Sequence, residues 1–184
     1  MRLFAAVYPP APALEHLTAA LGAALSSAGL DSSALVPRAN WHVTLAFYGE
    51  LPEGAAARCL RGLTSCLAHT GPFSVRLAGA GRYRGRVGWV GLTSESDPLE
   101  QVMTAAARAW PAPSQPAEPH LTVTRAAHRP AVAAALNELT HYEGPTWQIS
   151  RVHLVHSDLH AGAGHHPVYR KIGMVRLADP RPVP

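Results

Sequence analysis

The chain has 184 residues, of which 47% are hydrophobic and 15% are charged. This balance excludes an intrinsically disordered chain, and the length suits one compact domain, which we place at residues 1–184. The net charge of +4 is compatible with a polyanionic partner but is too small to identify one.

No segment of the sequence predicts a signal peptide or a membrane span. The apolar residues of the N-terminus stop at Pro9-Pro10, which leaves a run too short for the core of a signal peptide. No later stretch approaches the ~20 apolar residues that cross a bilayer. We therefore expect a cytoplasmic protein that does not contact a membrane, and we expect a monomer.

The first part of the chain alternates strands and helices. Leu3 to Tyr8 predicts a buried strand that ends at two prolines, and leucines at helical spacing predict a helix in Pro12 to Leu30. Alternating apolar residues with β-branched side chains predict a strand in Asn40 to Tyr48. An amphipathic pattern then predicts a second helix in Glu53 to His69.

The second predicted helix carries both cysteines, Cys59 and Cys66. Seven residues of helix separate their Cα atoms by about 10 Å, which is too far for a disulfide bond. Both fall on the apolar face of the helix, so we expect reduced cysteines that pack in the core.

The rest of the chain predicts a hairpin, a third helix, a strand, a fourth helix and two closing strands. In chain order these elements lie at Phe73 to Leu77, Val87 to Leu92, Pro98 to Trp110, Pro119 to Arg125, Val132 to Leu139, Ile149 to His156 and Val168 to Leu177. The two halves of the chain have a similar order of elements. We therefore predict an α+β fold of two pseudo-symmetric lobes, with mainly antiparallel sheet lining a central cleft and helices packed outside.

Two of the predicted strands share a His-x-Thr pattern with an apolar residue at each remaining position. In His42-Val43-Thr44-Leu45 the histidine and the threonine point to one side, because side chains two apart share a face of a strand. His120-Leu121-Thr122-Val123 repeats the arrangement. Set face to face across a groove, these strands would surround one small anion with two proton-transfer groups and two neutral donors.

A third copy of the pattern, His16-Leu17-Thr18-Ala19, falls in the first predicted helix. Positions two apart on a helix lie about 200° from each other, so His16 and Thr18 cannot serve one ligand together. We therefore exclude this copy as a site.

The paired motifs also resemble those of a known family. Together with the opening Arg2-Leu3-Phe4-Ala5-Ala6-Val7, the strand Val87-Gly88-Trp89-Val90-Gly91-Leu92 and the stretch from Leu154 and Ser157 through Gly164 to Tyr169, they resemble the two-histidine (2H) phosphoesterases. The similarity is greatest to the RNA 2′,3′-cyclic phosphodiesterase branch, also called 2′-5′ RNA ligases. One departure is Ala117-Glu118-Pro119, because relatives often carry an aromatic residue just before the second motif.

This resemblance implies metal-independent hydrolysis of 2′,3′-cyclic phosphodiesters in RNA or in nucleotides, without a cofactor, and the reverse 2′-5′ ligation. It assigns His120 as the base that deprotonates water and His42 as the acid that protonates O3′, so that a 2′-phosphomonoester is released. Imidazole suits both roles at neutral pH. The resemblance also assigns Thr44 and Thr122 to the non-bridging phosphate oxygens, where charge builds in the transition state.

Three further residues are candidate substrate contacts. Arg125 resembles the family's arginine just beyond the second motif, but strict alternation turns it away from His120 unless the strand bulges. Phe47 and Tyr169 either stack on a base or take part in ordinary packing.

Arg82, Arg84 and Arg86 share strand parity in the predicted hairpin. They form either a basic row that binds RNA phosphates or a solvent-facing hairpin tip. The sequence does not distinguish the two.

A histidine-rich run near the C-terminus invites a zinc interpretation: His153, His156, His160, His165 and His166. The first two have opposite parity on a strand, no cysteine lies nearby, and the spacing matches no recognised ligand set. The 12 acidic residues are scattered and do not favour a magnesium or manganese site. We expect a solvated loop and no metal.

Two other functions compete with RNA cyclic phosphodiester hydrolysis. One is hydrolysis of another small cyclic phosphate, such as ADP-ribose 1″,2″-cyclic phosphate. The other is a non-catalytic RNA-binding module, in which alanine at His42 and His120 would leave binding unchanged.

Overall fold

One antiparallel sheet organises the fold of the computed structural model, which describes residues 1–95, 97–111, 118–159, 161 and 167–177. The eight strands follow the order β6-β3-β4-β5-β2-β1-β7-β8. Their bounds are β1 Arg2–Val7, β2 Val43–Glu50, β3 Phe73–Tyr83, β4 Val87–Ser94, β5 His120–Thr124, β6 Trp147–Ile149, β7 Arg151–Asp158 and β8 Val168–Arg176. The helices are α1 Ala11–Ser27, α2 Ala55–Cys66, α3 Pro98–Ala107 and α4 Pro130–Glu138.

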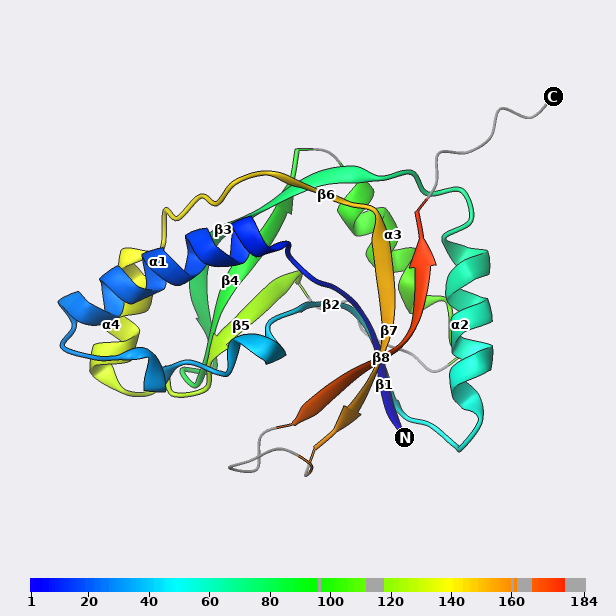
Figure 1. The fold of residues 1–184 in the computed structure, drawn as a ribbon, viewed down its shortest axis with the longest axis horizontal. Helices are drawn as coiled ribbons and strands as arrows, with labels where there is room; N and C mark the ends of the chain where they lie inside the picture. Colours follow the sequence, from blue (N-terminus) through cyan, green and yellow to red (C-terminus); the bar gives the residue numbers. More distant parts are fainter. Residues whose placement is uncertain (96, 112–117, 160, 162–166, 178–184) are drawn as a thin grey trace.

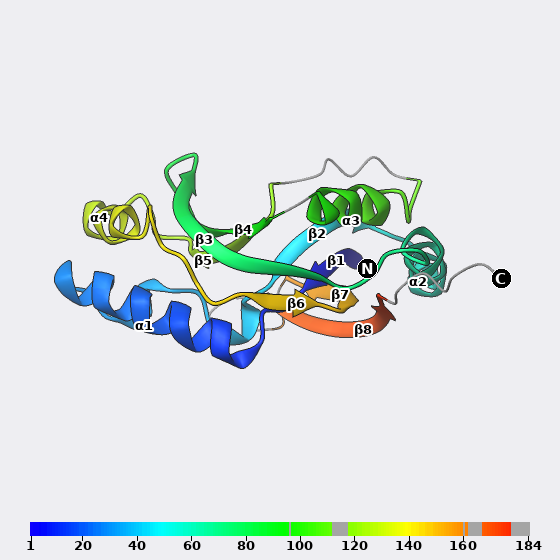
Figure 2. The same ribbon diagram turned by 90° about the horizontal axis from the view of Figure 1, so that it is seen from above.

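The sheet has two halves that the helices cover separately. Figures 1 and 2 show α1 and α4 beside β3, β4 and β5, whereas α2 and α3 lie at the other end of the molecule. Accordingly, α1 and α4 pack on each other and on β3, α3 packs on β2, and α2 packs on β8. The predicted α+β class, antiparallel pairing and outer helices are confirmed.

The two motif strands lie beside each other in the sheet. β2 pairs with β5 through Val43 and Leu121, and this pair joins the two halves. The predicted arrangement of two motif strands facing each other across a groove is therefore wrong. Both strands have a fully buried apolar side, and pairing them edge to edge places both sides in one core while satisfying backbone hydrogen bonds.

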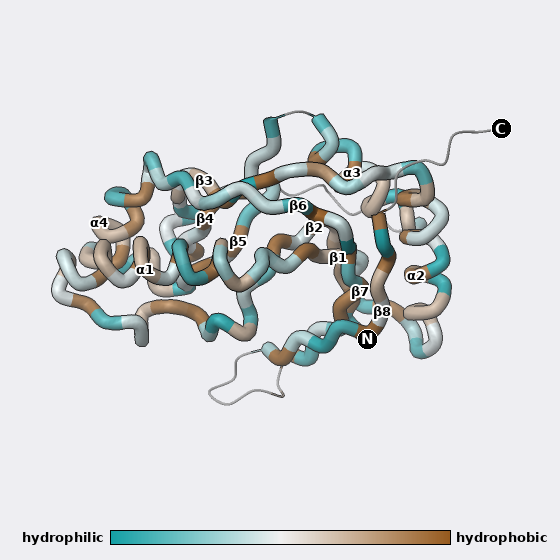
Figure 3. The backbone as a smooth tube through the Cα atoms, turned by 45° about the horizontal axis from the view of Figure 1, so that its top comes forward, coloured by the Kyte–Doolittle hydropathy of each residue, from teal (hydrophilic) through white to brown (hydrophobic). Residues whose placement is uncertain are grey.

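The first three helices are shorter than the sequence pattern predicts, whereas the fourth, α4, begins two residues before its predicted start. The first begins after Pro10 and ends before Gly29, whose φ of +67° favours a residue without a side chain. The second begins after Gly54 at φ +82°. Along α2 apolar and polar residues alternate (Figure 3), and the buried side contains the free cysteine Cys59, whereas the free Cys66 is half-buried.

The strand predicted at Ile149 to His156 is two strands, because β6 pairs with β3 and β7 pairs with β1. Among the described residues, no single helix combines the length and the apolar character needed to cross a membrane. Only the bent pair Ala11–Ser27 and Ser32–Asn40, which meet at 109°, passes that test by length and composition.

Candidate active site

His42, Thr44, His120 and Thr122 gather on one face of the sheet. Because β2 and β5 are antiparallel and pair at Val43 and Leu121, the register sets His42 across from Thr122 and Thr44 across from His120. Directly opposed Cα atoms are about 4.5–5.5 Å apart. The two motifs therefore meet head to tail, with a histidine and a threonine from different strands on each side.

The two imidazoles are oriented by equivalent hydrogen bonds. His42 Nδ1 lies 2.7 Å from the carbonyl oxygen of Asn40, and His120 Nδ1 lies 2.7 Å from that of Glu118. A carbonyl oxygen only accepts, so Nδ1 carries the hydrogen in both rings. This tautomer leaves Nε2 of each ring to exchange a proton with a substrate.

Aromatic rings enclose His42. Its ring centroid lies 4.8 Å from that of Tyr169, 4.9 Å from Phe4 and 6.1 Å from Tyr8. Burial lowers the pKa of His42 to about 4; the hydrogen bond to Asn40 partly opposes this effect, and electrostatic interaction with His120 and Arg125 reinforces it. His42 is therefore neutral at pH 7 in the free protein.

His120 has a more open environment. Tyr83 packs edge-on against it at 5.0 Å between ring centroids and donates a hydrogen bond from its hydroxyl to Glu118 Oε2 at 3.2 Å. Burial raises the pKa of Tyr83, and its bond to Glu118 adds to the effect, so the hydroxyl stays protonated. Tyr83 thus contacts both the His120 ring and the residue whose carbonyl orients that ring.

A small cavity of about 170 Å³ opens over the face of the sheet that carries the two motifs. It is below the 300–1,000 Å³ typical of sites for drug-sized ligands, and its size suits a phosphate group. His120 does not line it, although Thr44, its partner across the strand pair, does. The lining residues are Val36, Asn40, His42, Thr44, Thr122, Arg125, Pro167 and Tyr169.

Arg125 reaches this cavity because β5 bulges. Thr122 pairs with Trp89 and Thr124 pairs with the adjacent Gly88, so Val123 is an extra residue in β5. Val123 and Thr124 are both fully buried, and the alternation resumes with Arg125 on the His120 face. The bulge that Arg125 requires is therefore present.

The two aromatic candidates differ in position. Tyr169 lines the cavity and packs edge-on against His42. Phe47 does not line the cavity. It pairs with Phe4 of the neighbouring strand β1, is 39% exposed, and has the Arg2 guanidinium 4.5 Å from its ring centroid.

Of the two alternatives for the arginines of the β3–β4 hairpin, their positions match the solvent-facing hairpin tip. Arg84 and Gly85 both have positive φ, +47° and +66°, as a tight two-residue turn requires. Arg84 and Arg86 therefore lie in the turn, and among the three only Arg82 lies on a strand. All three are exposed and none lines the cavity.

The described part of the chain contains no group of three or more His, Cys, Asp or Glu residues that could hold a metal ion. His153 pairs with Ala6 and His156 with Leu3, so the two histidines lie on opposite faces of β7. His160, His165 and His166 lie outside the described residues.

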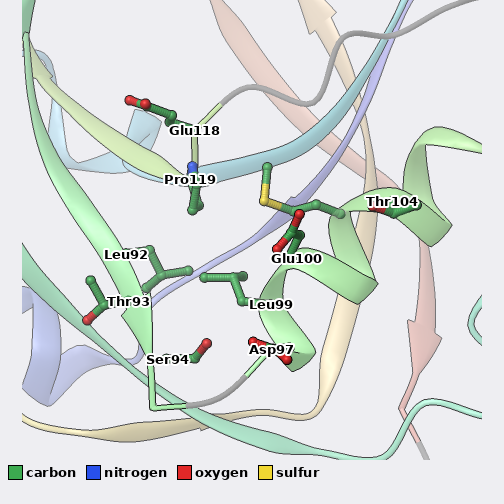
Figure 4. A pocket seen from close by; sticks show the side chains of 10 residues that line it. Leu92, Thr93, Ser94, Asp97, Leu99, Glu100, Thr104, Glu118 and Pro119 are labelled. Atoms are coloured by element: carbon green, nitrogen blue, oxygen red, sulfur yellow. The ribbon is translucent and has the colours of Figure 1, made fainter.

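A second cavity, shown in Figure 4, lies between β4, the start of α3 and the residues before β5. It has a volume of about 480 Å³ and is larger than the motif cavity. Its charged lining residues are Asp97, Glu100 and Glu118, which would repel a phosphate. Charge therefore favours the smaller cavity as the phosphate site.

The sequence analysis missed the residues that surround the two histidines: Phe4, Tyr8, Asn40, Tyr83 and Trp89. Strand parity could have found the first two, because positions 4, 6 and 8 share the face of β1 that adjoins Thr44. Asn40 orients His42 from two positions away through its main-chain carbonyl, which any residue type supplies, so its identity gives no signal. Tyr83 contacts Glu118 from a separate segment, which a local pattern does not reveal.

Comparisons with known proteins identify the family of the chain. The family model of the 2′-5′ RNA ligase superfamily matches residues 9–161. Curated proteins named RNA 2′,3′-cyclic phosphodiesterase are similar: one from Methanothermobacter thermautotrophicus is 30% identical over 75% of this chain and 79% of its own length. One from Aeropyrum pernix is 29% identical over 76% of this chain and 84% of its own length. One from Geobacillus stearothermophilus is 30% identical over 59% of this chain, which is only 39% of the length of that relative.

Solved structures share the fold. A Thermus thermophilus protein, TT0787, has a TM-score of 0.71 at 25% identity, with 97% of this chain and 99% of that chain covered. Escherichia coli LigT in complex with 3′-AMP has a TM-score of 0.74 at 22% identity, with 97% and 98% covered.

Proposed function

The chain belongs to the 2′-5′ RNA ligase superfamily, and from that premise we propose that it hydrolyses 2′,3′-cyclic phosphodiesters, at RNA ends or in 2′,3′-cyclic nucleotides, to 2′-phosphomonoesters. The observation that carries the proposal is the register of β2 and β5, which sets each motif histidine beside the threonine of the other motif. The names of the curated relatives support the same reaction.

In the proposed reaction the cyclic phosphate occupies the cavity between Thr44 and Thr122, whose hydroxyls donate hydrogen bonds to the non-bridging oxygens. His120 Nε2 takes a proton from water as the water oxygen bonds to phosphorus. The bond from phosphorus to O3′ breaks, and His42 Nε2 gives its proton to O3′. The guanidinium of Arg125 adds a positive charge beside the phosphate.

The acid role requires a protonated His42, although the pKa of about 4 leaves it neutral in the free protein. A bound phosphodiester carries a negative charge, and an opposite charge within a few ångströms raises the pKa of an imidazole. The Asn40 carbonyl also favours the protonated ring. Substrate binding is therefore the event that charges His42.

The same groups serve ligation, in which a ribose 5′-hydroxyl takes the place of water. His120 accepts the hydroxyl proton as O5′ bonds to phosphorus, and O3′ leaves with the proton of His42, which gives a 2′-5′ bond; cleavage of that bond by O3′ is the reverse reaction. Because water is present at a far higher concentration than any RNA end, hydrolysis dominates. Tyr169 beside His42 and the exposed Phe47 offer aromatic surfaces on which the terminal base can stack.

The test is incubation of the protein with 2′,3′-cyclic AMP in the presence of a chelator, with the product identified by phosphorus NMR. We expect 2′-AMP at a rate that the chelator does not change. Formation of 3′-AMP would contradict O3′ as the leaving atom, and loss of turnover with the chelator would indicate a metallohydrolase. Faster turnover of ADP-ribose 1″,2″-cyclic phosphate would replace the RNA assignment, and no turnover of either compound would favour a binding module.

A further inference from the structure

A third cavity, of about 500 Å³, lies next to the motif cavity at the ends of β1, β6 and β7. Its polar and aromatic lining residues are Tyr8, Trp147, Gln148, Arg151, His153 and Lys171. None of them has a role in the reaction proposed above, and this combination of cationic and aromatic side chains is chemically distinct from the acidic cavity of Figure 4.

Tyr8 is the wall that this cavity shares with the active site. Its ring centroid lies 6.1 Å from that of His42 on one side and 5.5 Å from that of His153 on the other. Lys171 Nζ lies 3.8 Å from the same centroid. A ligand that extends from the phosphate past His42 therefore meets Tyr8 and then Lys171.

Neither cation of this cavity forms an ion pair within the described part of the chain. Arg151 and Lys171 are exposed, and among the described residues no carboxylate lies within 4.0 Å of either. The pKa of His153 is lowered by burial first and then by Lys171 and Arg151, so both cations act at this one place. Two cations without a carboxylate partner beside a phosphate site favour a second phosphate as the ligand.

The cavity also presents aromatic surfaces. Tyr8 and Trp147 are half-buried, so part of each side chain remains accessible. Nucleobases of single-stranded RNA stack on such side chains, and the neighbouring cations bind the backbone. Burial raises the pKa of Tyr8 to about 12, and the charge of Tyr169 adds to this, so Tyr8 keeps its hydroxyl hydrogen as a donor.

We propose that this cavity binds the nucleotide preceding the terminal cyclic phosphate of an RNA, with Arg151 and Lys171 on the phosphate that links the last two nucleotides. The inference rests on the proposed function, because a His42 that protonates O3′ must face the terminal ribose. That ribose, and the chain attached to its O5′, then lie on the Tyr8 side. The preferred substrate is an oligoribonucleotide and not a mononucleotide.

The experiment compares two substrates, 2′,3′-cyclic AMP and the dinucleotide ApA with a 2′,3′-cyclic phosphate end. The variant is Arg151→Ala with Lys171→Ala. The control is Arg61→Ala with Arg170→Ala, which removes two exposed arginines that line neither cavity. A second variant, Arg151→Lys with Lys171→Arg, keeps both charges. It distinguishes the loss of positive charge from a disturbance of the fold by substitution at these two positions.

We expect kcat/KM of the wild type to be higher for the dinucleotide, and the alanine variant to lower that value about 10-fold with a weaker dependence on salt. Turnover of cyclic AMP should change less than about two-fold, and the control and charge-keeping variants should resemble the wild type. An equal loss for both substrates, or no loss for either, would overturn the subsite. If the wild type hydrolyses neither substrate, the proposed function itself fails.

Discussion

The two motif strands have the same sequence pattern and the same backbone anchoring, but their histidines lie in different surroundings. Phe4, Tyr8 and Tyr169 enclose His42, whereas His120 has Tyr83 on one side and is more open. Burial lowers the pKa of His42 to about 4. The motif therefore supplies two equivalent groups, and the neighbouring strands make them unequal.

This difference shows that the residues around each histidine, and not the motif itself, decide which histidine acts as the acid and which as the base. On a symmetric pair of motifs, either histidine could take either role. The pKa of an enclosed imidazole rises strongly when an anion binds beside it. The low polarity of the surroundings disfavours the charged ring in the free protein, and the same low polarity strengthens the attraction of the charged ring to a bound phosphate. Substitutions at His42, at His120 or at their neighbours test this difference.

The largest effect is expected from removing either imidazole. His42→Ala and His120→Ala should each lower kcat for 2′,3′-cyclic AMP by about 10²- to 10⁴-fold, because each removes one proton transfer. Steady-state kinetics measure this. His16→Ala, in the helical copy of the motif, is the matched control and should retain wild-type kcat; a loss there, or full activity in either of the others, would refute the pairing.

The next effect concerns the threonines that stand across from the histidines. Thr44→Val and Thr122→Val keep the shape of the side chain and remove the donor, so kcat should fall by about 10²- to 10³-fold with a smaller change in KM. Thr64→Val, whose hydroxyl donates to a helix carbonyl, is the control. A rise in KM alone would show that the threonines bind the substrate and its transition state equally.

Protein stability should also depend on the buried state of His42. The pKa of His42 is lowered from 6.5 in the unfolded chain to about 4 in the folded one. Between these values the unfolded chain binds the proton and the folded protein does not, so stability falls as pH drops from 6.5 towards 4, by at most about 3 kcal/mol from this residue.

Urea unfolding at pH 7 and pH 4.5 measures this dependence. In His42→Asn, whose amide can still donate to the Asn40 carbonyl, the loss of stability on acidification should be smaller than in the wild type. His153, whose pKa is also lowered, contributes equally to both proteins. The same loss in wild type and variant would contradict a buried, neutral His42.

The smallest effect is expected on the open side of the comparison. Tyr83→Phe keeps the ring against His120 and removes the hydrogen bond to Glu118. One such bond contributes about 1 kcal/mol, so kcat should fall about 5-fold, with little change in KM. Tyr142→Phe, which removes a bond to the distant His16, is the control, and an equal loss there would exclude a positioning role for Tyr83.

The sequence was sufficient for the parts of the site that depend on local pattern. His42, Thr44, His120 and Thr122 were found because strand alternation exposes alternate side chains, and the helical copy at His16 was excluded by the same geometry. The α+β class followed from the order of elements. These are properties that neighbouring residues determine on their own.

Other parts depend on which strands become neighbours. Edge-to-edge pairing of β2 with β5 buries Val43 and Leu121 in one core, and a local pattern carries no information about that choice. The extra residue Val123 and the turn at Arg84 likewise depend on pairing with β4 and β3. The positions of Arg125 and of the hairpin arginines therefore follow from strand pairing and not from strand alternation alone.

The central claim is that His42 and His120 act on one phosphate, and NMR of the two labelled imidazoles during titration with 2′-AMP tests it most directly. We predict that both ring signals shift with a single common Kd and that the pKa of His42 rises from about 4 when the nucleotide is bound. Two different Kd values, or a shift confined to one histidine, would contradict the claim.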